Sequence, residues 1–168
     1  MSTPTMEQAT EKHSGLKMAD SLVKASEALA ELNARTESID NSGNLEILGF
    51  SRQHLKALRD LLTRGTRVVE RRIAELEGGA QARYSQGRRY DFSRNAIMEP
   101  ITFFASYRGC CRALCAAMKV AMASADSATV LLLRDIVLRL EKELWMIDAP
   151  ERNRGVDDSR AVALFLSC

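Results

Sequence analysis

The chain has 168 residues, of which 46% are hydrophobic and 27% charged, a composition typical of one soluble globular domain with its own core. Its formal net charge of +2 is too small to indicate a nucleic-acid binder by itself. Three Pro and nine Gly leave few helix breakers, which favours an all-α protein.

No apolar run approaches the roughly 20 residues that span a bilayer, so we expect no membrane segment. The first twenty residues lack both a basic start and an apolar block, and they do not resemble a secretory signal. We therefore expect a cytoplasmic protein. Cysteines in such a compartment stay reduced.

Residues 1–15 are small and polar without periodicity, which predicts a flexible tail with no net positive charge. From Leu16 to about Ile39, apolar residues recur with the heptad spacing of a helix that buries one face. The predicted core positions of this helix are Leu22, Ala25, Leu29, Leu32, Thr36 and Ile39. The run DNSGN at 40–44 predicts a reversal of the chain.

A second helix is predicted from Leu45 or Ser51 to Glu77, ending before Gly78-Gly79. Its inner stripe is formed by apolar residues, which are Leu48, Leu55, Leu58, Leu62, Val69, Ile73 and Leu76. Residues 80–97 have no helical period and are rich in Arg and Tyr, which predicts a crossover loop.

A third helix should start near Pro100, because proline is well suited to a first helical turn, and run to about Ser124. Its predicted apolar face contains Phe104, Cys111, Leu114, Cys115, Met118 and Met122. Asp126 or Ser127 should cap a fourth helix, which Pro150 should end. Two antiparallel pairs joined by a long middle connection form a ferritin-like four-helix bundle, here over residues 16–150.

Residues 151–168 are predicted to form a polar linker followed by a short amphipathic C-terminal helix. That helix would expose the apolar side chains of Val162, Leu164, Phe165 and Leu166 unless something covers them. Its cover is either the chain's own bundle or a neighbouring subunit.

Three of the four cysteines, Cys110, Cys111 and Cys115, fall within the third predicted helix, and Cys168 ends the chain. Reduced cysteine behaves as a small hydrophobic side chain, so core packing is the favoured role. Cys111 and Cys115 lie one helical turn apart and could clasp a soft metal, but a tetrahedral site needs four ligands.

Two blocks, VERRIAELEGGA at 69–80 and ASADSATVLLLRDIVLRLEKELWMIDAP at 123–150, resemble the Dps family of DNA-protection-during-starvation proteins. The resemblance extends over about residues 16–150. It implies a ferritin-like fold, a shell of about twelve subunits, stress-related DNA binding and protection, nucleoid association, and a role in iron homeostasis. It also implies that Trp145 packs at the end of the bundle, close to Leu138, in the core or at a subunit contact.

The iron-oxidising ligands of that family are largely missing from this chain. The resemblance implies a His late in the first helix, then a His and an Asp, and later an Asp and a Glu, in the second. Aligned on Glu70, these five positions hold Ile39, Ser51, Leu55, Thr66 and Glu70. A shift of one residue in the turn replaces the first three with Asp40, Arg52 and Lys56, and two cations would repel a metal ion.

Carboxylates and imidazoles are the ligands that iron oxidation needs, and the chain has only two histidines, His13 and His54. Only Glu70 survives from the family's ligand set, as a relic metal ligand or, the favoured interpretation, as a partner of Arg67, Arg71 or Arg72. We therefore expect no cofactor, no catalytic residue, and ferroxidase activity that is absent or strongly reduced.

Between positions 64 and 94 there are eight arginines and four acidic residues, a local excess of four positive charges. Such a cluster, interleaved with Tyr84, Tyr90 and Phe92, can hold nucleic-acid phosphates, although a solvated loop with intersubunit salt bridges would look the same. The candidate DNA-binding residues are Arg64, Arg67, Arg71, Arg83, Arg88, Arg89 and Arg94, with Arg72 in the same cluster.

Three functions are therefore compatible with the sequence. The first is a Dps-like shell of about twelve subunits that binds DNA without working iron sites. The second is a mini-ferritin that oxidises and stores iron through ligands that have moved. The third is a structural shell that grips a protein partner through residues 151–168.

Overall fold

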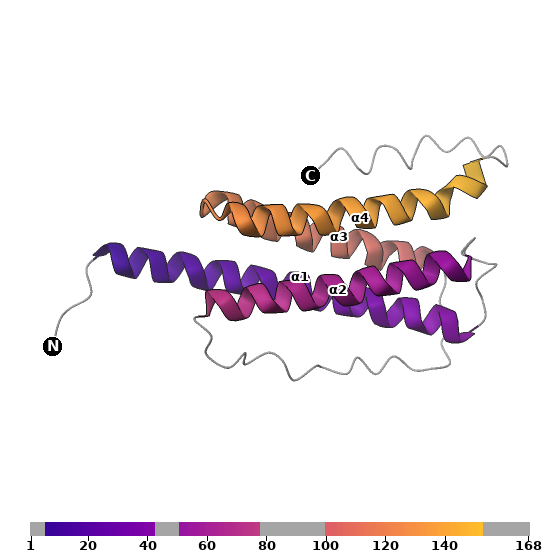
Figure 1. Cartoon of the computed structure of the whole chain (residues 1–168), viewed down its shortest axis with the longest axis horizontal. Coiled ribbons are helices and arrows are strands. Elements are labelled where there is room, and N and C mark those ends of the chain that lie inside the picture. The colour runs from indigo at the N-terminus through magenta and orange to yellow at the C-terminus, as the bar shows by residue number, and fades with distance from the viewer. Residues whose placement is uncertain (1–5, 43–50, 78–99, 153–168) are drawn as a thin grey trace.

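The computed structural model describes residues 6–42, 51–77 and 100–152. Within these ranges the chain forms four α-helices and no strand, which confirms the all-α prediction (Figure 1). The helices are α1 (Met6–Ser42), α2 (Arg52–Leu76), α3 (Pro100–Ala123) and α4 (Ser127–Arg152).

The four helices pack as a bundle in which α1 contacts α2 and α3, while α4 contacts the same two helices from the other side. Figure 1 shows that α1 and α4 run in one direction and α2 and α3 in the other. Neighbouring helices are thus antiparallel, and the end of α2 and the start of α3 lie at opposite ends of the bundle.

The core positions predicted for α1 are all buried, at 0 or 1% exposure. Thr36 is the polar member of this row, and its hydroxyl donates to the Leu32 carbonyl 2.7 Å away, so no buried donor is wasted. The start of the helix differs from the prediction, because α1 begins at Met6 and residues 6–15 belong to it. These first turns extend beyond the ends of the other helices, where an amphipathic pattern is not required (Figure 1).

The start of α2 is set by Ser51, whose hydroxyl accepts a hydrogen bond from the His54 N–H at 3.2 Å. The predicted inner stripe is confirmed, with Leu76 only half-buried and Leu48 outside the described residues. Gly65 lies in this stripe, where the chain passes close to Ile136 of α4 and Leu29 of α1. The predicted crossover loop at 80–97 lies outside the described residues.

Pro100 begins α3 as predicted, but the buried face of α3 is rotated from the predicted one. Met122 is 65% exposed, and Phe104, Cys111 and Met118 only flank the core. Of the predicted face, Leu114 and Cys115 are confirmed as buried. The buried residues of α3 are Phe103, Tyr107, Cys110, Leu114, Cys115, Ala117 and Ala121. Because α3 is apolar on most of its circumference, periodicity alone does not select one face.

Tyr107 faces the core because its hydroxyl has a partner there. The hydroxyl donates to the Leu140 carbonyl of α4, and Tyr107 is 1% exposed. Burial raises the pKa of Tyr107 well above its usual range, since the phenolate would lose its hydration. The side chain thus serves as a neutral donor that joins α3 to α4.

A tight turn connects α3 to α4. Ala125 has a φ of 55°, the left-handed conformation that commonly ends a helix, and the Asp126 N–H donates to the Ala121 carbonyl at 3.0 Å. Asp126 then caps α4, as predicted. The prediction that Pro150 ends α4 is wrong, because the helix runs to Arg152. Near a helix terminus, the missing proline N–H removes a single hydrogen bond, and Figure 1 shows the last turn bent from the helix axis.

Candidate functional site

The arginine stripe on α2 is exposed to solvent. Arg64, Arg67 and Arg71 all lie on the outer face of the helix, and none forms an ion pair with a carboxylate in the described part of the chain. Within the described part of the chain, their one side-chain hydrogen bond runs from Arg64 Nε to the Asp60 carbonyl at 3.1 Å. Their charge is thus available to a partner. Arg83, Arg88, Arg89 and Arg94 lie outside the described residues.

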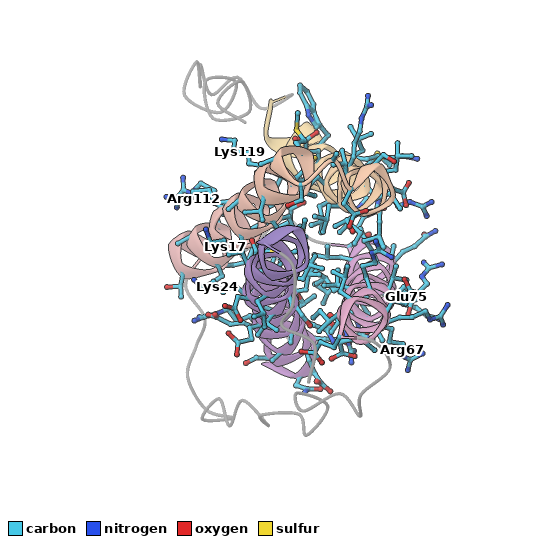
Figure 2. The ribbon with its side chains drawn as sticks, turned by 90° about the vertical axis from the view of Figure 1, so that its left-hand side faces the viewer. Lys17, Lys24, Arg67, Glu75, Arg112 and Lys119 are labelled. Carbon is cyan, nitrogen blue, oxygen red and sulfur yellow. The ribbon has the colours of Figure 1, made fainter. Side chains whose placement is uncertain are left out.

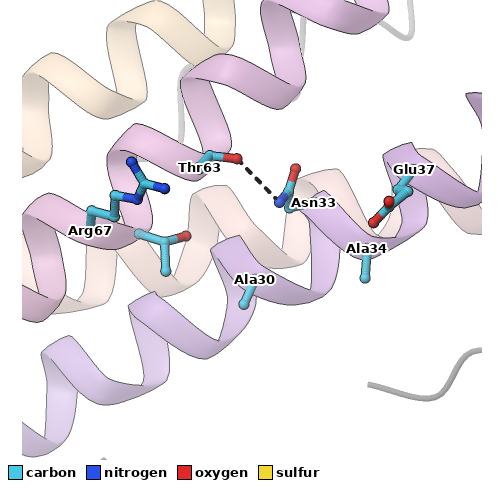
Figure 3. A pocket seen from close by; sticks show the side chains of 7 residues that line it. Ala30, Asn33, Ala34, Glu37, Thr63 and Arg67 are labelled. Atoms are coloured by element: carbon cyan, nitrogen blue, oxygen red, sulfur yellow. Dashed lines mark hydrogen bonds between the residues drawn. The ribbon is translucent and has the colours of Figure 1, made fainter. Parts of the chain in front are cut away.

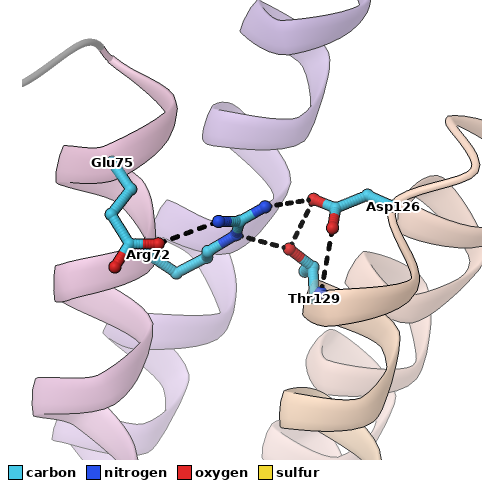
Figure 4. Close-up of polar contacts among 4 residues, drawn as sticks. All are labelled: Arg72, Glu75, Asp126 and Thr129. Atoms are coloured by element: carbon cyan, nitrogen blue, oxygen red, sulfur yellow. Dashed lines mark hydrogen bonds and ion pairs between the residues drawn. The ribbon is translucent and has the colours of Figure 1, made fainter.

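Arg72, which the sequence groups with this stripe, has a structural role instead (Figure 4). Its Nε donates to the Thr129 hydroxyl at 2.8 Å, and its terminal nitrogens contact Glu75 at 2.8 Å and Asp126 at 2.9 Å. The Thr129 hydroxyl in turn donates to Asp126 at 2.6 Å. This network joins the end of α2 to the start of α4, so Arg72 is not available to bind phosphate.

The network shifts the ionisation of both charged partners. Hydrogen bonds from Arg72 to Asp126 and Glu75 raise the pKa of Arg72. Burial alone would raise the pKa of Asp126, but the hydrogen bonds from Thr129 and Arg72 outweigh it and hold that pKa below its ordinary value. Both groups are therefore charged at neutral pH.

A second basic face lies on α3, and the sequence analysis missed it. Arg108, Arg112 and Lys119 are exposed, and the stretch Pro100–Ala123 contains no acidic residue. Figure 2 shows Arg112 and Lys119 on the same side of the bundle as Lys17 and Lys24 of α1, opposite to Arg67. A 24-residue helix with three cations and no acid was the signal available in the sequence.

The positions aligned with iron ligands do not form a polar cluster. Ile39 and Leu55 are each 1% exposed and belong to the core, while the Thr66 hydroxyl donates to the Leu62 carbonyl at 2.9 Å. Asp40, the shifted alternative, pairs with Arg59 at 2.9 Å. Among the described residues, no group of three or more His, Cys, Asp or Glu side chains is arranged to hold a metal ion.

Glu70 is exposed on α2 and forms no ion pair with Arg67, Arg71 or Arg72. The expected pair, on the helix surface or at a subunit contact, is not formed within the described residues, because Arg72 turns towards α4 and binds Glu75 and Asp126 instead. Its pairing with a neighbouring subunit stays a prediction.

A shallow hollow of about 290 Å³ lies between α1 and α2 (Figure 3). Asn33 lies in it and donates to the Thr63 hydroxyl at 3.4 Å, while its buried Oδ1 has no hydrogen-bond partner among the described residues. The remaining lining residues are Ala30, Ala34, Glu37, Thr66 and Arg67. The two alanines leave the hollow open, and the polar and charged residues of its lining make it mixed in polarity. It contains no nucleophile paired with a base.

The α3 thiols fit the packing role proposed from the sequence, because Cys110 and Cys115 are buried and Cys111 is partly buried. Cys110, Cys111 and Cys115 are reduced, and Cys110 is 1% exposed. Burial raises the pKa of Cys110 well above its usual range, which disfavours the reactive thiolate.

Trp145 and Leu138, which the resemblance places at the end of the bundle, in the core or at a subunit contact, are not fully covered by this chain. Trp145 is 50% exposed and Leu138 is 53% exposed, because both lie on the side of α4 that faces away from the core. A role for both residues at a subunit contact stays a prediction. Phe165 lies outside the described residues.

No family model, curated protein or solved structure matches this chain. No helix in the described ranges is long and apolar enough to cross a membrane.

Proposed function

We propose that the chain is a Dps-like protein that assembles into a ferritin-like shell of about twelve subunits and binds DNA, without ferroxidase activity. The order of helices supports the ferritin-like part of the proposal. Because α2 and α3 are parallel and their connected ends lie at opposite ends of the bundle, the connection between them must be long, as in ferritin-like bundles.

The exposed arginine stripe on α2 is the observation that carries DNA binding. Three guanidinium groups on one helical face, with no carboxylate partner among the described residues, can each contact a phosphate oxygen. One such stripe binds weakly, but a shell presents many copies to the same DNA, and these act together. The basic face of α3 lies on the other side of the bundle, so assembly that covers one face leaves the other exposed.

The absence of ferroxidase activity is supported by the residues that replace its ligands. Two of the aligned positions, Ile39 and Leu55, contribute hydrocarbon side chains to the core, and neither can bind a metal ion. Rebuilding such a site would require ligands from elsewhere in the chain.

The test of DNA binding compares two double variants of the full chain that lose the same charge from α2. Arg67→Ala with Arg71→Ala removes the stripe, whereas Arg52→Ala with Lys56→Ala removes two exposed cations at the start of the helix. We expect the first to weaken DNA binding at least tenfold and to make its salt dependence shallower by about one unit of logarithmic slope for each lost phosphate contact.

The control variant should bind DNA like the wild type. An equal loss of DNA affinity in both variants would mean that the net charge of the protein, rather than the arginine stripe, is responsible for DNA binding. No mobility shift by wild type at low salt would overturn DNA binding and favour the structural shell. A particle mass far below about twelve times 18.7 kDa would overturn the shell. Saturable Fe(II) oxidation faster than in buffer would favour the mini-ferritin.

A further inference from the structure

The outer surface of α4 carries a row of large apolar side chains that the chain's described residues leave exposed. Leu131, Leu138 and Trp145 are 64%, 53% and 50% exposed, respectively. They are spaced by seven residues, so they lie nearly on one line along the helix, about 10 Å apart. We call this row the α4 seam. Single exposed apolar residues are common, but a row with heptad spacing is typical of a helix that packs against another helix.

Charged residues border the α4 seam on both sides. At 100° per residue, Asp135 and Lys142 lie along one edge, and Arg134 and Glu141 along the other. Asp135 already contacts Arg139 at 2.9 Å, with both side chains more than half exposed. Arg134, Glu141 and Lys142 form no ion pair with any other described residue.

We propose that the α4 seam is the contact with a second copy of this chain, packed antiparallel about a two-fold axis that passes at Leu138. The interface about such an axis is self-complementary only if residues that lie equally far from the axis, on opposite sides of it, can pair. Leu131 and Trp145 are each seven residues from Leu138, so the leucine of one copy packs on the indole of the other.

The charged edges match in the same arrangement. A two-fold axis perpendicular to both helices places like edges together and reverses their direction. Asp135 of one copy then lies beside Lys142 of the other, and Arg134 lies beside Glu141. In each pair the two residues lie three and four residues from Leu138, so their positions along the helix differ by one residue, or about 1.5 Å. Four intermolecular ion pairs of opposite sign therefore surround the apolar row.

A parallel pair is the main alternative, since it would place Arg134 beside Asp135 and Glu141 beside Lys142. It would also stack Trp145 on Trp145 and Leu131 on Leu131, which gives end layers of unequal volume. The antiparallel pair combines a large with a smaller side chain in each end layer and opposes the two helix dipoles. The observations thus favour the antiparallel pair, which names one contact of the proposed shell but needs neither DNA binding nor twelve subunits.

The first test measures the mass of the full chain by analytical ultracentrifugation. Leu138→Lys places two ammonium groups on the axis, and we expect it to weaken association at least a hundredfold. Met122→Lys is the matched control, because Met122 is an apolar residue on α3 that is at least as exposed as Leu138. Circular dichroism should show unchanged helix content in both variants, since both sites are on the surface.

The second test distinguishes the two orientations by exchanging charges. Asp135→Lys alone should weaken association about tenfold, because it faces Lys142. Adding Lys142→Asp should restore association to within about threefold of wild type in the antiparallel pair. In a parallel pair the double variant faces Arg134 with Lys and Glu141 with Asp, and it should associate more weakly than the single variant.

A wild type that is monomeric at about 100 µM would overturn the proposal. So would self-association that Leu138→Lys leaves unchanged, or that Met122→Lys weakens as much as Leu138→Lys does. A double variant that associates more weakly than Asp135→Lys alone would also overturn it. A monomer would indicate that another part of the chain, such as residues 159–168, covers the seam. A stable dimer that binds no DNA and forms no larger particle would support the α4 seam while refuting the proposed shell.

Discussion

Arg72 of α2 reaches the start of α4 and donates a hydrogen bond to Asp126 across 2.9 Å, although the two residues are 54 positions apart. Their side chains are only 22% and 15% exposed, so water screens the pair less than it does an exposed salt bridge. Asp126 also caps α4 through the Thr129 N–H at 3.0 Å. One carboxylate therefore fixes both the start of a helix and its position against a neighbour.

The first prediction concerns the charge of Asp126. Asp126→Asn keeps a good capping side chain but removes the negative charge, so it should lower the free energy of unfolding by about 1–2 kcal/mol at pH 7. The pKa of Asp126 in the folded state lies below its ordinary value of 3.8. A depressed carboxyl pKa stabilises the fold above the unfolded-state pKa, and this contribution is lost as pH falls through the folded-state pKa.

The difference between wild type and Asp126→Asn should therefore be constant from pH 7 to about 5 and should shrink below about pH 4. Urea unfolding of both proteins at each pH measures it. Asp60→Asn is the control, because it neutralises an exposed carboxylate on α2 and should have little effect on the free energy of unfolding. Thr36→Ser is not suitable, because it alters the core. A difference that stays the same down to pH 3 would contradict the role assigned to the carboxylate.

The second prediction concerns Gly65, the glycine at the contact of α2 with α1 and α4. A Cβ added there would lie 3.6 Å from Ile136 Cγ2 and 3.7 Å from Leu29 Cδ1, both ordinary contact distances. Gly65→Ala should therefore raise the free energy of unfolding by about 0.5–1 kcal/mol, because alanine loses less backbone entropy in a helix. Thermal unfolding measures the gain.

Gly109→Ala provides the matched control, because Gly109 is exposed in α3 and a Cβ there meets nothing within 4 Å. A similar gain in both variants is expected if helix propensity is the cause. A loss of stability in Gly65→Ala alone would mean that the helices approach too closely there for a methyl group.

The third prediction concerns Ala125, which has a φ of 55° in the turn between α3 and α4. Non-glycine residues are strained by about 1 kcal/mol in this conformation, so Ala125→Gly should raise the free energy of unfolding by about 0.5–1 kcal/mol. Ala116→Gly, at an exposed position within α3, should instead lower it by about the same amount. If Ala125→Gly and Ala116→Gly lowered the free energy of unfolding equally, the left-handed conformation of Ala125 would be contradicted.

Local chemistry in the sequence determined where three of the four described helices begin. Ser51 and Asp126 are polar caps, and Pro100 fits a first turn, so each marks its boundary through contacts made within three residues. The heptad rows of α1 and α2 likewise predicted their buried faces, because the apolar residues of each row recur at heptad spacing and most of these positions are buried. The start of α1 at Met6 was missed, since residues 6–15 carry no amphipathic pattern in the sequence.

The tertiary structure decided which residues are buried or paired on helix faces that carry both polar and apolar side chains. The sequence does not distinguish Arg72 from Arg71, because only the position of Asp126 on another helix binds one and leaves the other exposed. It also does not show that Trp145 is left half-exposed, or that α3 buries Tyr107 rather than Met122. Burial and pairing depend on which helix is adjacent, and that is a contact between residues far apart in the chain rather than a property of any one segment.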